Sequence, residues 1–214
     1  MRRFSRIFAW TTLFFVAGAV LFFTKAAALP YKVAWPVLLL SLATFLSRRR
    51  ELLPFGFAFL FSAAGDAVGA RGLFIPQMAF FALAHVAYVC WFLPRARRRL
   101  RAVSLAVTVP LLVFLFAAIV PEAPFPAERI GVAVYGLVIA AMLYSALQYD
   151  GACAAGFRCA ALLFVFSDAV IAWNRFIGPV PARTWIVMIT YYLAQYLFFP
   201  VSYTHLTLPT KLEV

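Results

Sequence analysis

Charged side chains are scarce in this sequence. Asp, Glu, Lys and Arg make up 12% of the 214 residues, and only seven residues are acidic, whereas soluble domains are about 25% charged. Hydrophobic residues account for 66% of the chain, and the mean hydropathy is +0.96. A water-soluble globular protein is therefore excluded, and we interpret the chain as an integral membrane protein.

The features of several other protein classes are also missing. The net charge of +12 comes without a polar domain to carry a basic surface, so nucleic-acid binding is excluded. No segment alternates as a barrel strand does. The three cysteines show neither CxxC spacing nor the even count of a disulfide framework. No GxSxG, HExxH, Walker or GxGxxG motif occurs in a suitable context. Without a linker or a shift in composition, residues 1–200 are expected to form a single integral membrane domain.

The apolar runs predict an all-α fold, a polytopic membrane bundle of about eight transmembrane helices. Most runs span roughly 17 to 23 residues, the length that an α-helix needs to cross ~30 Å of hydrocarbon. The first run is longer than the apolar region of a signal peptide, so we expect it to be retained. The expected helices are Ile7–Phe23, Val33–Leu46, Leu52–Ala70, Phe74–Leu93, Ala102–Val120, Ile130–Tyr149, Ala154–Trp173 and Thr184–Phe199.

A sequence repeat relates the two halves of the chain. DAVGARGLFI from Asp66 aligns without a gap to DAVIAWNRFI from Asp168, 102 positions later. If the amino terminus is inside, the loops and termini on that side hold 13 Lys and Arg residues, against 6 on the other side. The positive-inside rule then places both termini in the cytoplasm. The third and seventh helices run in the same direction, which predicts two parallel four-helix pseudo-repeats.

Asp66 and Asp168 are the strongest candidates for catalytic residues. A charged side chain at the bilayer centre costs at least ~2.5 kcal/mol, so an intramembrane acid normally faces the protein interior and marks a site. Each acid lies 14 residues after the expected start of its helix, which is ~21 Å from the cytoplasmic edge. Both acids are therefore at one depth, and no Lys or Arg lies at that depth.

Other polar side chains interrupt the apolar helices. His85 and Tyr88 are three residues apart on the fourth helix, and Gln195 takes the place of His85 in the second half, because LAQ there matches LAH. Tyr192 lies in the middle of the last helix, where its hydroxyl group needs a partner. Further candidate substrate contacts are Ser62, Ser167 and Asn174. For Ser62 and His85, an ordinary role in helix packing stays an alternative.

Four basic residues lie near the outer helix ends, where the headgroup of a lipid would sit. They are Lys32, Arg71, Arg175 and Arg183. Capture of a phosphate and simple anchoring at the membrane interface are both open for these residues.

The end of the chain is unlike the rest. VSYTHLTLPTK, from Val201, resembles translated sequencing-adapter sequence, and LEV resembles the start of a protease-tag site. We expect residues 201–214 to be a non-native tail, and His205 is excluded from the candidate site.

The motifs in order resemble one known family. KVAWP at residues 32–36, FSAAGDAV, FFALAHVAYVCWF, VYGLVIAAMLYSAL, LLFVFSDAVIAWNRF and YYLAQYL are similar to the blocks of the YhhN-like lysoplasmalogenase family of multi-pass membrane proteins. The resemblance implies a hydrolase that cleaves the vinyl-ether bond of lysoplasmalogens to a fatty aldehyde and glycerophosphoethanolamine or glycerophosphocholine. It implies a lysophospholipid substrate, contact with membrane lipid and a location in the bacterial inner membrane. The headgroup preference and a homo-oligomeric state stay open.

The chemistry of this reaction fits the polar residues. Protonation of the β-carbon of a vinyl ether gives an oxocarbenium ion that water captures, so one carboxyl group must carry a proton and another must be ionised. We expect Asp66 and Asp168 to be this acid and base pair. His85, Tyr88, Tyr192 and Gln195 would orient water and the ether oxygen. No cofactor or metal is required.

Two other functions stay open at this point. In one, the protein is a transporter or receptor whose paired acids bind a cation or relay protons. In the other, it is a metal-dependent lipid amidase or esterase, with the metal held by the histidine and the two aspartates.

Overall fold

The computed structural model describes the backbone of residues 2–24 and 31–205 and the side chains of residues 7–24 and 31–199. Over these residues the protein is built from helices, without a strand beyond an isolated bridge between Ala96 and Tyr149. The α-helices are α1 (Arg2–Phe23), α2 (Trp35–Leu46), α3 (Leu53–Gly69), α4 (Phe74–Phe92), α5 (Arg101–Phe114), α6 (Pro126–Gln148), α7 (Ala154–Phe176) and α8 (Arg183–His205). The predicted all-α class and the eight helices are confirmed.

Among the described residues, five helical segments are long and apolar enough to cross a membrane. They are Arg50–Gly69, Phe74–Arg95, Arg98–Glu122, Pro126–Gln148 and Ala154–Phe176, and two shorter apolar helices are Ile7–Phe23 and Trp35–Leu46. Because a spanning segment must satisfy its backbone hydrogen bonds internally, long apolar sequences of this kind fold as helices in a bilayer. The protein is an integral membrane protein of the polytopic helical type.

The region between α5 and α6 differs from the expectation. The fifth helix is α-helical only to Phe114 and continues as a π-helical turn, η4 (Leu115–Ile119), and a 3₁₀ turn, η5 (Val120–Glu122). The sixth helix begins at Pro126 and not at Ile130. Proline is tolerated in the first turn of a helix, because the amide that it lacks would have no partner there. The connection between the fifth and sixth helices is thus shorter than the predicted helix bounds implied.

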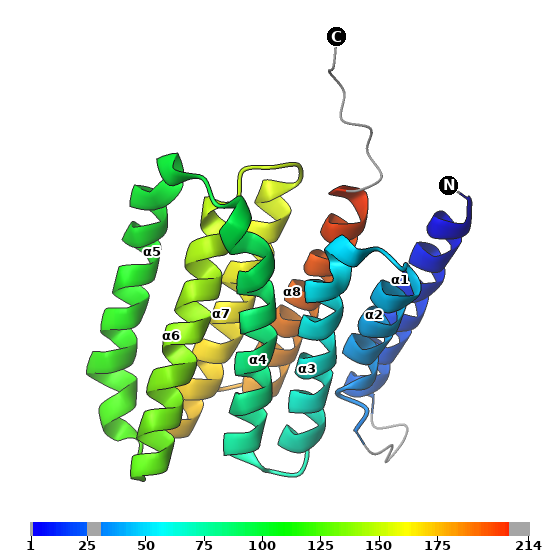
Figure 1. Ribbon diagram of the computed structural model, residues 1–214. Helices are drawn as coiled ribbons and strands as arrows, with labels where there is room; N and C mark the ends of the chain where they lie inside the picture. The colour runs from blue at the N-terminus through cyan, green and yellow to red at the C-terminus, as the bar shows by residue number, and fades with distance from the viewer. Residues whose placement is uncertain (1, 25–30, 206–214) are drawn as a thin grey trace.

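The two halves of the bundle are arranged alike. Helices α3 and α7 run in the same direction, as do α4 and α8, and α1 begins at the end of the bundle where α8 ends (Figure 1). The α3 helix packs on α4 as α7 packs on α8, while α4 contacts α6 and α8 contacts α2. These matching contacts are those of two parallel four-helix pseudo-repeats, as the sequence repeat predicts.

Aromatic side chains pack where the halves meet. Phe55 and Phe157, 102 positions apart like the two aspartates, are both fully buried. Their rings stack with a centroid distance of 5.6 Å and an interplanar angle of 21°. The rings of Phe92 and Phe198 contact both of these rings and also each other. Helices in a membrane associate through van der Waals packing, and this cluster of rings provides such packing between the two halves.

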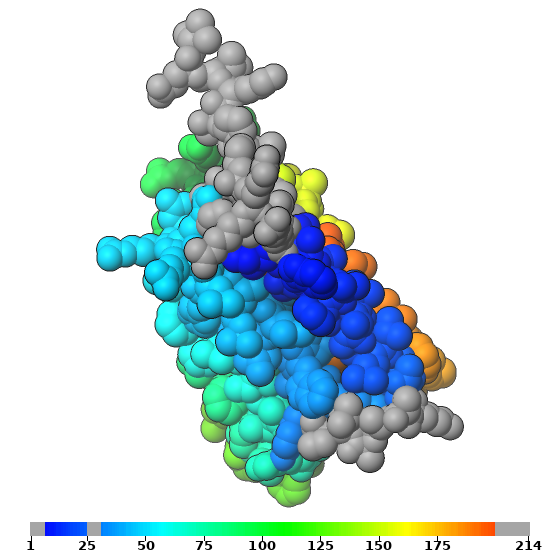
Figure 2. Space-filling view, turned by 90° about the vertical axis from the view of Figure 1, so that its right-hand side faces the viewer, coloured from blue at the N-terminus to red at the C-terminus, as the bar shows by residue number. Residues whose placement is uncertain are grey.

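The outer surface of the bundle is apolar. Figure 2 shows the face that α1 and α2 cover, where the large side chains Trp10, Phe14 and Leu42 are about half exposed. Trp10 and Phe14 also stack on each other, with ring centroids 6.0 Å apart. An apolar surface that is wide and continuous is unusual for a soluble protein, whereas lipid chains solvate it in a membrane.

The orientation of the bundle gives a testable prediction. We expect a cysteine at Arg97, in a chain whose natural cysteines are replaced by alanine, to react with a membrane-impermeant thiol reagent only after the cells are lysed. The reason is that the loops rich in arginine stay in the cytoplasm. Gly178→Cys, between α7 and α8 at the opposite end, is the matched control and should react in intact spheroplasts. Labelling of Arg97→Cys from outside would reverse the topology.

Candidate functional site

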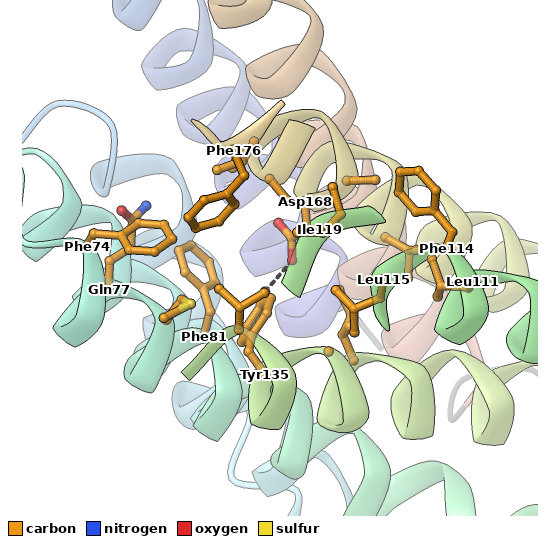
Figure 3. A pocket seen from close by; sticks show the side chains of 18 residues that line it. Phe74, Gln77, Phe81, Leu111, Phe114, Leu115, Ile119, Tyr135, Asp168 and Phe176 are labelled. Atoms are coloured by element: carbon orange, nitrogen blue, oxygen red, sulfur yellow. Dashed lines mark hydrogen bonds between the residues drawn. The ribbon is translucent and has the colours of Figure 1, made fainter. Parts of the chain in front are cut away.

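An apolar pocket lies between α4, α5, α6 and α7. It is open at its mouth, and most of the residues that line it are apolar. The polar side chains in its wall are Gln77, Tyr135 and Asp168, and aromatic rings line much of the rest (Figure 3). An alkyl chain matches the apolar character of this wall.

Asp168 is the carboxyl group in this pocket. The hydroxyl group of Tyr135, from α6, donates a hydrogen bond to Asp168 Oδ2 (Figure 3). His85 Nε2, from α4, lies 3.1 Å from Tyr135 Oη and 3.6 Å from Asp168 Oδ2. The His85 side chain is fully buried, whereas that of Asp168 is 14% exposed. Three groups that carry or accept protons therefore meet at one point, and the Asp168 carboxylate can be reached from the pocket.

The π-helical turn forms another part of the pocket wall. Leu115, in that turn, lies against Gly136 of α6, where an added Cβ atom would be only 1.9 Å from Leu115 Cδ2. The lack of a side chain at Gly136, directly after Tyr135, thus leaves room for Leu115 in its observed position. Single π-helical turns are often found at functional sites, and this one shapes the pocket beside the polar cluster.

Asp66 occupies a second, more enclosed position. Its side chain is buried, and its Oδ2 accepts a hydrogen bond of 2.7 Å from the Tyr191 hydroxyl group of α8. Phe81 links the two positions, because it lines the pocket and its ring lies 5.9 Å from that of Tyr191. The carboxyl groups of Asp66 and Asp168 are near enough to interact electrostatically. Each carboxyl nevertheless has its own tyrosine donor, and their joint role stays a prediction.

The other polar residues of α4 and α8 bond to one another or to the backbone. Tyr88 donates a hydrogen bond of 3.0 Å to Gln195 Oε1, and both side chains are fully buried. Tyr192 donates to the Val33 carbonyl oxygen at 2.8 Å. Tyr88, Tyr192 and Gln195 are not among the residues that line the pocket. Contacts between them and a substrate stay predictions, while their hydrogen bonds hold α4, α8 and the start of α2 together.

Two of the three remaining candidates make hydrogen bonds within the protein. The Ser167 hydroxyl group donates to the Val187 carbonyl oxygen at 3.3 Å, and Asn174 Oδ1 accepts from the Val180 amide at 3.1 Å. The first bond connects α7 to α8, and the second connects α7 to the loop that precedes α8. Ser62 is fully buried, and its hydroxyl oxygen has no hydrogen-bond partner among the described residues.

The four basic candidates are not equivalent. Arg175 forms an ion pair of 2.5 Å with Glu128, and its guanidinium lies 3.8 Å from the ring centroid of Phe74, which lines the pocket. Arg71 bonds to the Tyr31 hydroxyl group at 2.7 Å, and Lys32 bonds to the Thr24 carbonyl oxygen at 3.0 Å. Arg183 is the exposed first residue of α8. Among these four, Arg175 is the one in contact with a pocket residue.

The sequence analysis missed Tyr135. Its signal was present, because a tyrosine in the middle of an apolar helix needs a partner for its hydroxyl group, the argument that was applied to Tyr192. Within the described part of the chain, no three His, Cys, Asp or Glu side chains come together as a group that could hold a metal. In particular, Asp66 bonds to Tyr191 and does not join His85 and Asp168 as a third ligand.

Known proteins resemble most of this chain. The YhhN family matches residues 22–200. Lysoplasmalogenase TMEM86B of Homo sapiens is 39% identical over 144 residues, which cover 65% of this chain and 59% of the human protein. The Sus scrofa protein of the same name is 34% identical over 142 residues (65% and 59%), and lysoplasmalogenase TMEM86A of Bos taurus is 34% identical over 154 residues (64% and 60%). The chain thus spans about three-fifths of the length of these curated relatives. No solved structure matches.

Proposed function

The chain belongs to the YhhN family, and from this membership we propose that it is a lysoplasmalogenase. It would hydrolyse the vinyl-ether bond of a lysoplasmalogen to a fatty aldehyde and glycerophosphoethanolamine or glycerophosphocholine. The observation that carries the proposal is that Asp168 and Tyr135 line an otherwise apolar pocket and that the buried His85 contacts both of them. The names of the similar mammalian proteins support the same reaction.

The pocket suits a lipid with a single chain. In the proposed complex, the alkenyl chain lies among the aromatic and aliphatic side chains of the pocket, and the vinyl ether lies at Asp168. Because the chain already lies in hydrocarbon in the membrane, its place in the pocket serves to fix the reacting bond next to the carboxylate. A saturated chain would bind equally well, so the chemistry and not the binding would select the vinyl ether.

The proposed reaction adds water under acid catalysis. A proton is delivered to the β-carbon, and the positive charge is shared by the α-carbon and the ether oxygen. The Asp168 carboxylate stabilises this oxocarbenium ion and takes a proton from the water molecule that bonds to the α-carbon. In the resulting hemiacetal, the bond from this carbon to the glycerol oxygen breaks, the proton of the hemiacetal hydroxyl group passes to that oxygen, and the aldehyde leaves. One water molecule is consumed, and the protein groups return to their starting states.

Two groups are candidates for the first proton donor. The pairing of the two aspartates assigns this role to Asp66. His85 is the alternative, because Tyr135 Oη lies 3.1 Å from His85 Nε2 and also bonds to Asp168. In that case the Tyr135 hydroxyl group returns the proton from Asp168 to His85 after each turnover.

We also propose where the reaction takes place. The pocket is lined by the start of α4 and the end of α7, at the end of the bundle opposite the loops that hold most of the arginines. With both termini in the cytoplasm of a bacterial inner-membrane protein, the pocket lies in the outer half of the membrane. The substrate then enters from the outer leaflet.

An assay on purified protein tests this function. We expect aldehyde and glycerophosphoethanolamine in equal amounts from the alkenyl lysolipid, and no aldehyde from the matched alkyl lysolipid, because only the vinyl ether gives a stabilised cation on protonation. In D₂O the aldehyde should carry one deuterium at the carbon next to the carbonyl. A transporter would release no aldehyde, and a metal-dependent esterase would lose its activity with a chelator.

A further inference from the structure

An ion pair lies next to the aromatic end of the pocket. Arg175 contacts two pocket residues, with its guanidinium 3.8 Å from the ring centroid of Phe74 and 5.6 Å from that of Phe176. Its Nη2 atom donates to Glu128 Oε1 at 2.5 Å. The Arg175 side chain is 40% exposed. Since a guanidinium has five N–H donors, donors remain for a second anion at this position.

Glu128 has a free hydrogen-bonding atom although it is buried. Its side chain is only 9% exposed, and Oε2 has no hydrogen-bond partner among the described residues. A buried carboxylate oxygen without a partner is costly, and such atoms in native proteins call for an explanation such as a bound ligand. The atom needs a donor of hydrogen bonds, and a positive charge would suit it best.

The position of Glu128 matches the length of the lipid headgroup. Glu128, Val132, Tyr135 and Gly136 lie on one face of α6, and the last three line the pocket. Seven residues of helix separate Glu128 from Tyr135, a rise of ~10.5 Å. In the substrate, nine bonds separate the vinyl-ether oxygen from the ethanolamine nitrogen, which is ~10–11 Å when extended. A lipid whose ether oxygen lies near Tyr135 therefore places its amine near Glu128.

We propose that Arg175 and Glu128 form a subsite for the zwitterionic headgroup that selects ethanolamine over choline, an inference that rests on the proposed function. Arg175 binds the phosphate, and the ammonium group donates a hydrogen bond to Glu128 Oε2. The trimethylammonium group of choline has no N–H to donate, so it leaves this oxygen without a hydrogen bond. The same pair of residues thus places the headgroup and sets the distance from it to the reacting bond.

Binding of saturated ether lysolipids tests the subsite independently of turnover. The probes are 1-O-hexadecyl-glycerophosphoethanolamine and its choline counterpart, which differ only in three methyl groups and are not hydrolysed. We expect the full-length protein to bind the ethanolamine lipid about tenfold more tightly, the effect of one charge-assisted hydrogen bond. Glu128→Gln should bring the ratio of the two Kd values to about one, and Glu128→Asp should retain part of the preference. Arg175→Gln should weaken both lipids and leave the ratio above one.

A matched control and two contrary results complete the test. Glu122→Gln makes the same charge change at an exposed position near the start of α6 and should alter neither Kd. If Glu128→Gln weakens both lipids equally, the ion pair only joins α6 to α7, and the proposal is wrong. If the wild-type protein binds the two lipids equally, it is also wrong. Aldehyde release by the wild-type protein is measured separately, so a failure of the proposed reaction is recognised independently.

Discussion

Asp168→Asn is expected to lower kcat for a lysoplasmalogen about 1,000-fold, with little change in KM, because it removes a charge that acts on the transition state. Asparagine has nearly the same size and its side-chain oxygen still accepts a hydrogen bond from Tyr135. The neutral amide, however, neither stabilises an oxocarbenium ion well nor takes a proton from water. The loss should therefore appear in the chemical step and not in binding.

The measurement is the initial rate of aldehyde release, together with the melting temperature of the purified variant. Asp150→Asn is the matched control, because Asp150 makes ion pairs with Arg99 and Arg158 at the opposite end of the bundle. That variant should keep its rate to within about twofold, since partly exposed ion pairs contribute little to stability. A folded Asp168→Asn protein with a near-normal kcat would rule out a catalytic role for this carboxylate.

Asp66→Asn is expected to lower kcat by at least about 100-fold if the two aspartates act as one acid and base pair. Asp66 is buried and bonded to Tyr191, and asparagine can keep that hydrogen bond, so the fold should persist. Groups that act as a unit are not additive, and the double variant with Asp168→Asn should be little worse than either single one.

The comparison of the Asp66 and His85 variants identifies the proton donor. Single-turnover rates of Asp66→Asn and His85→Gln are measured with the same alkenyl lysolipid. A large loss in Asp66→Asn and a smaller one in His85→Gln would support the pair of aspartates. If Asp66→Asn keeps a normal rate while His85→Gln and Asp168→Asn are inactive, the pairing of the two aspartates is wrong. The acid and the base are then His85 and Asp168, connected by Tyr135.

The repeat in the sequence also predicted more symmetry than the site has. Asp66 and Asp168 occupy equivalent positions on α3 and α7, and each contacts the other half, Asp66 through α8 and Asp168 through α4, but Asp168 has in addition a tyrosine donor from α6. Only Asp168 lines the pocket. A gapless alignment fixes the backbone positions of two residues, whereas the partner of a side chain depends on which neighbouring helix carries a tyrosine at that height.

The sequence by itself determined the fold class, the number of helices, the parallel arrangement of the halves and the two intramembrane acids. These follow from physical constraints that act on the chain locally, because a bilayer admits long apolar helices and makes every buried charge expensive. The tertiary structure alone decided how the helices are rotated toward one another. That rotation brings Tyr135 and His85 to Asp168, leaves Asp66 outside the pocket and pairs Arg175 with Glu128. It could not be predicted from the sequence, because a helix that is apolar on all sides has no polar face to show which side turns inward.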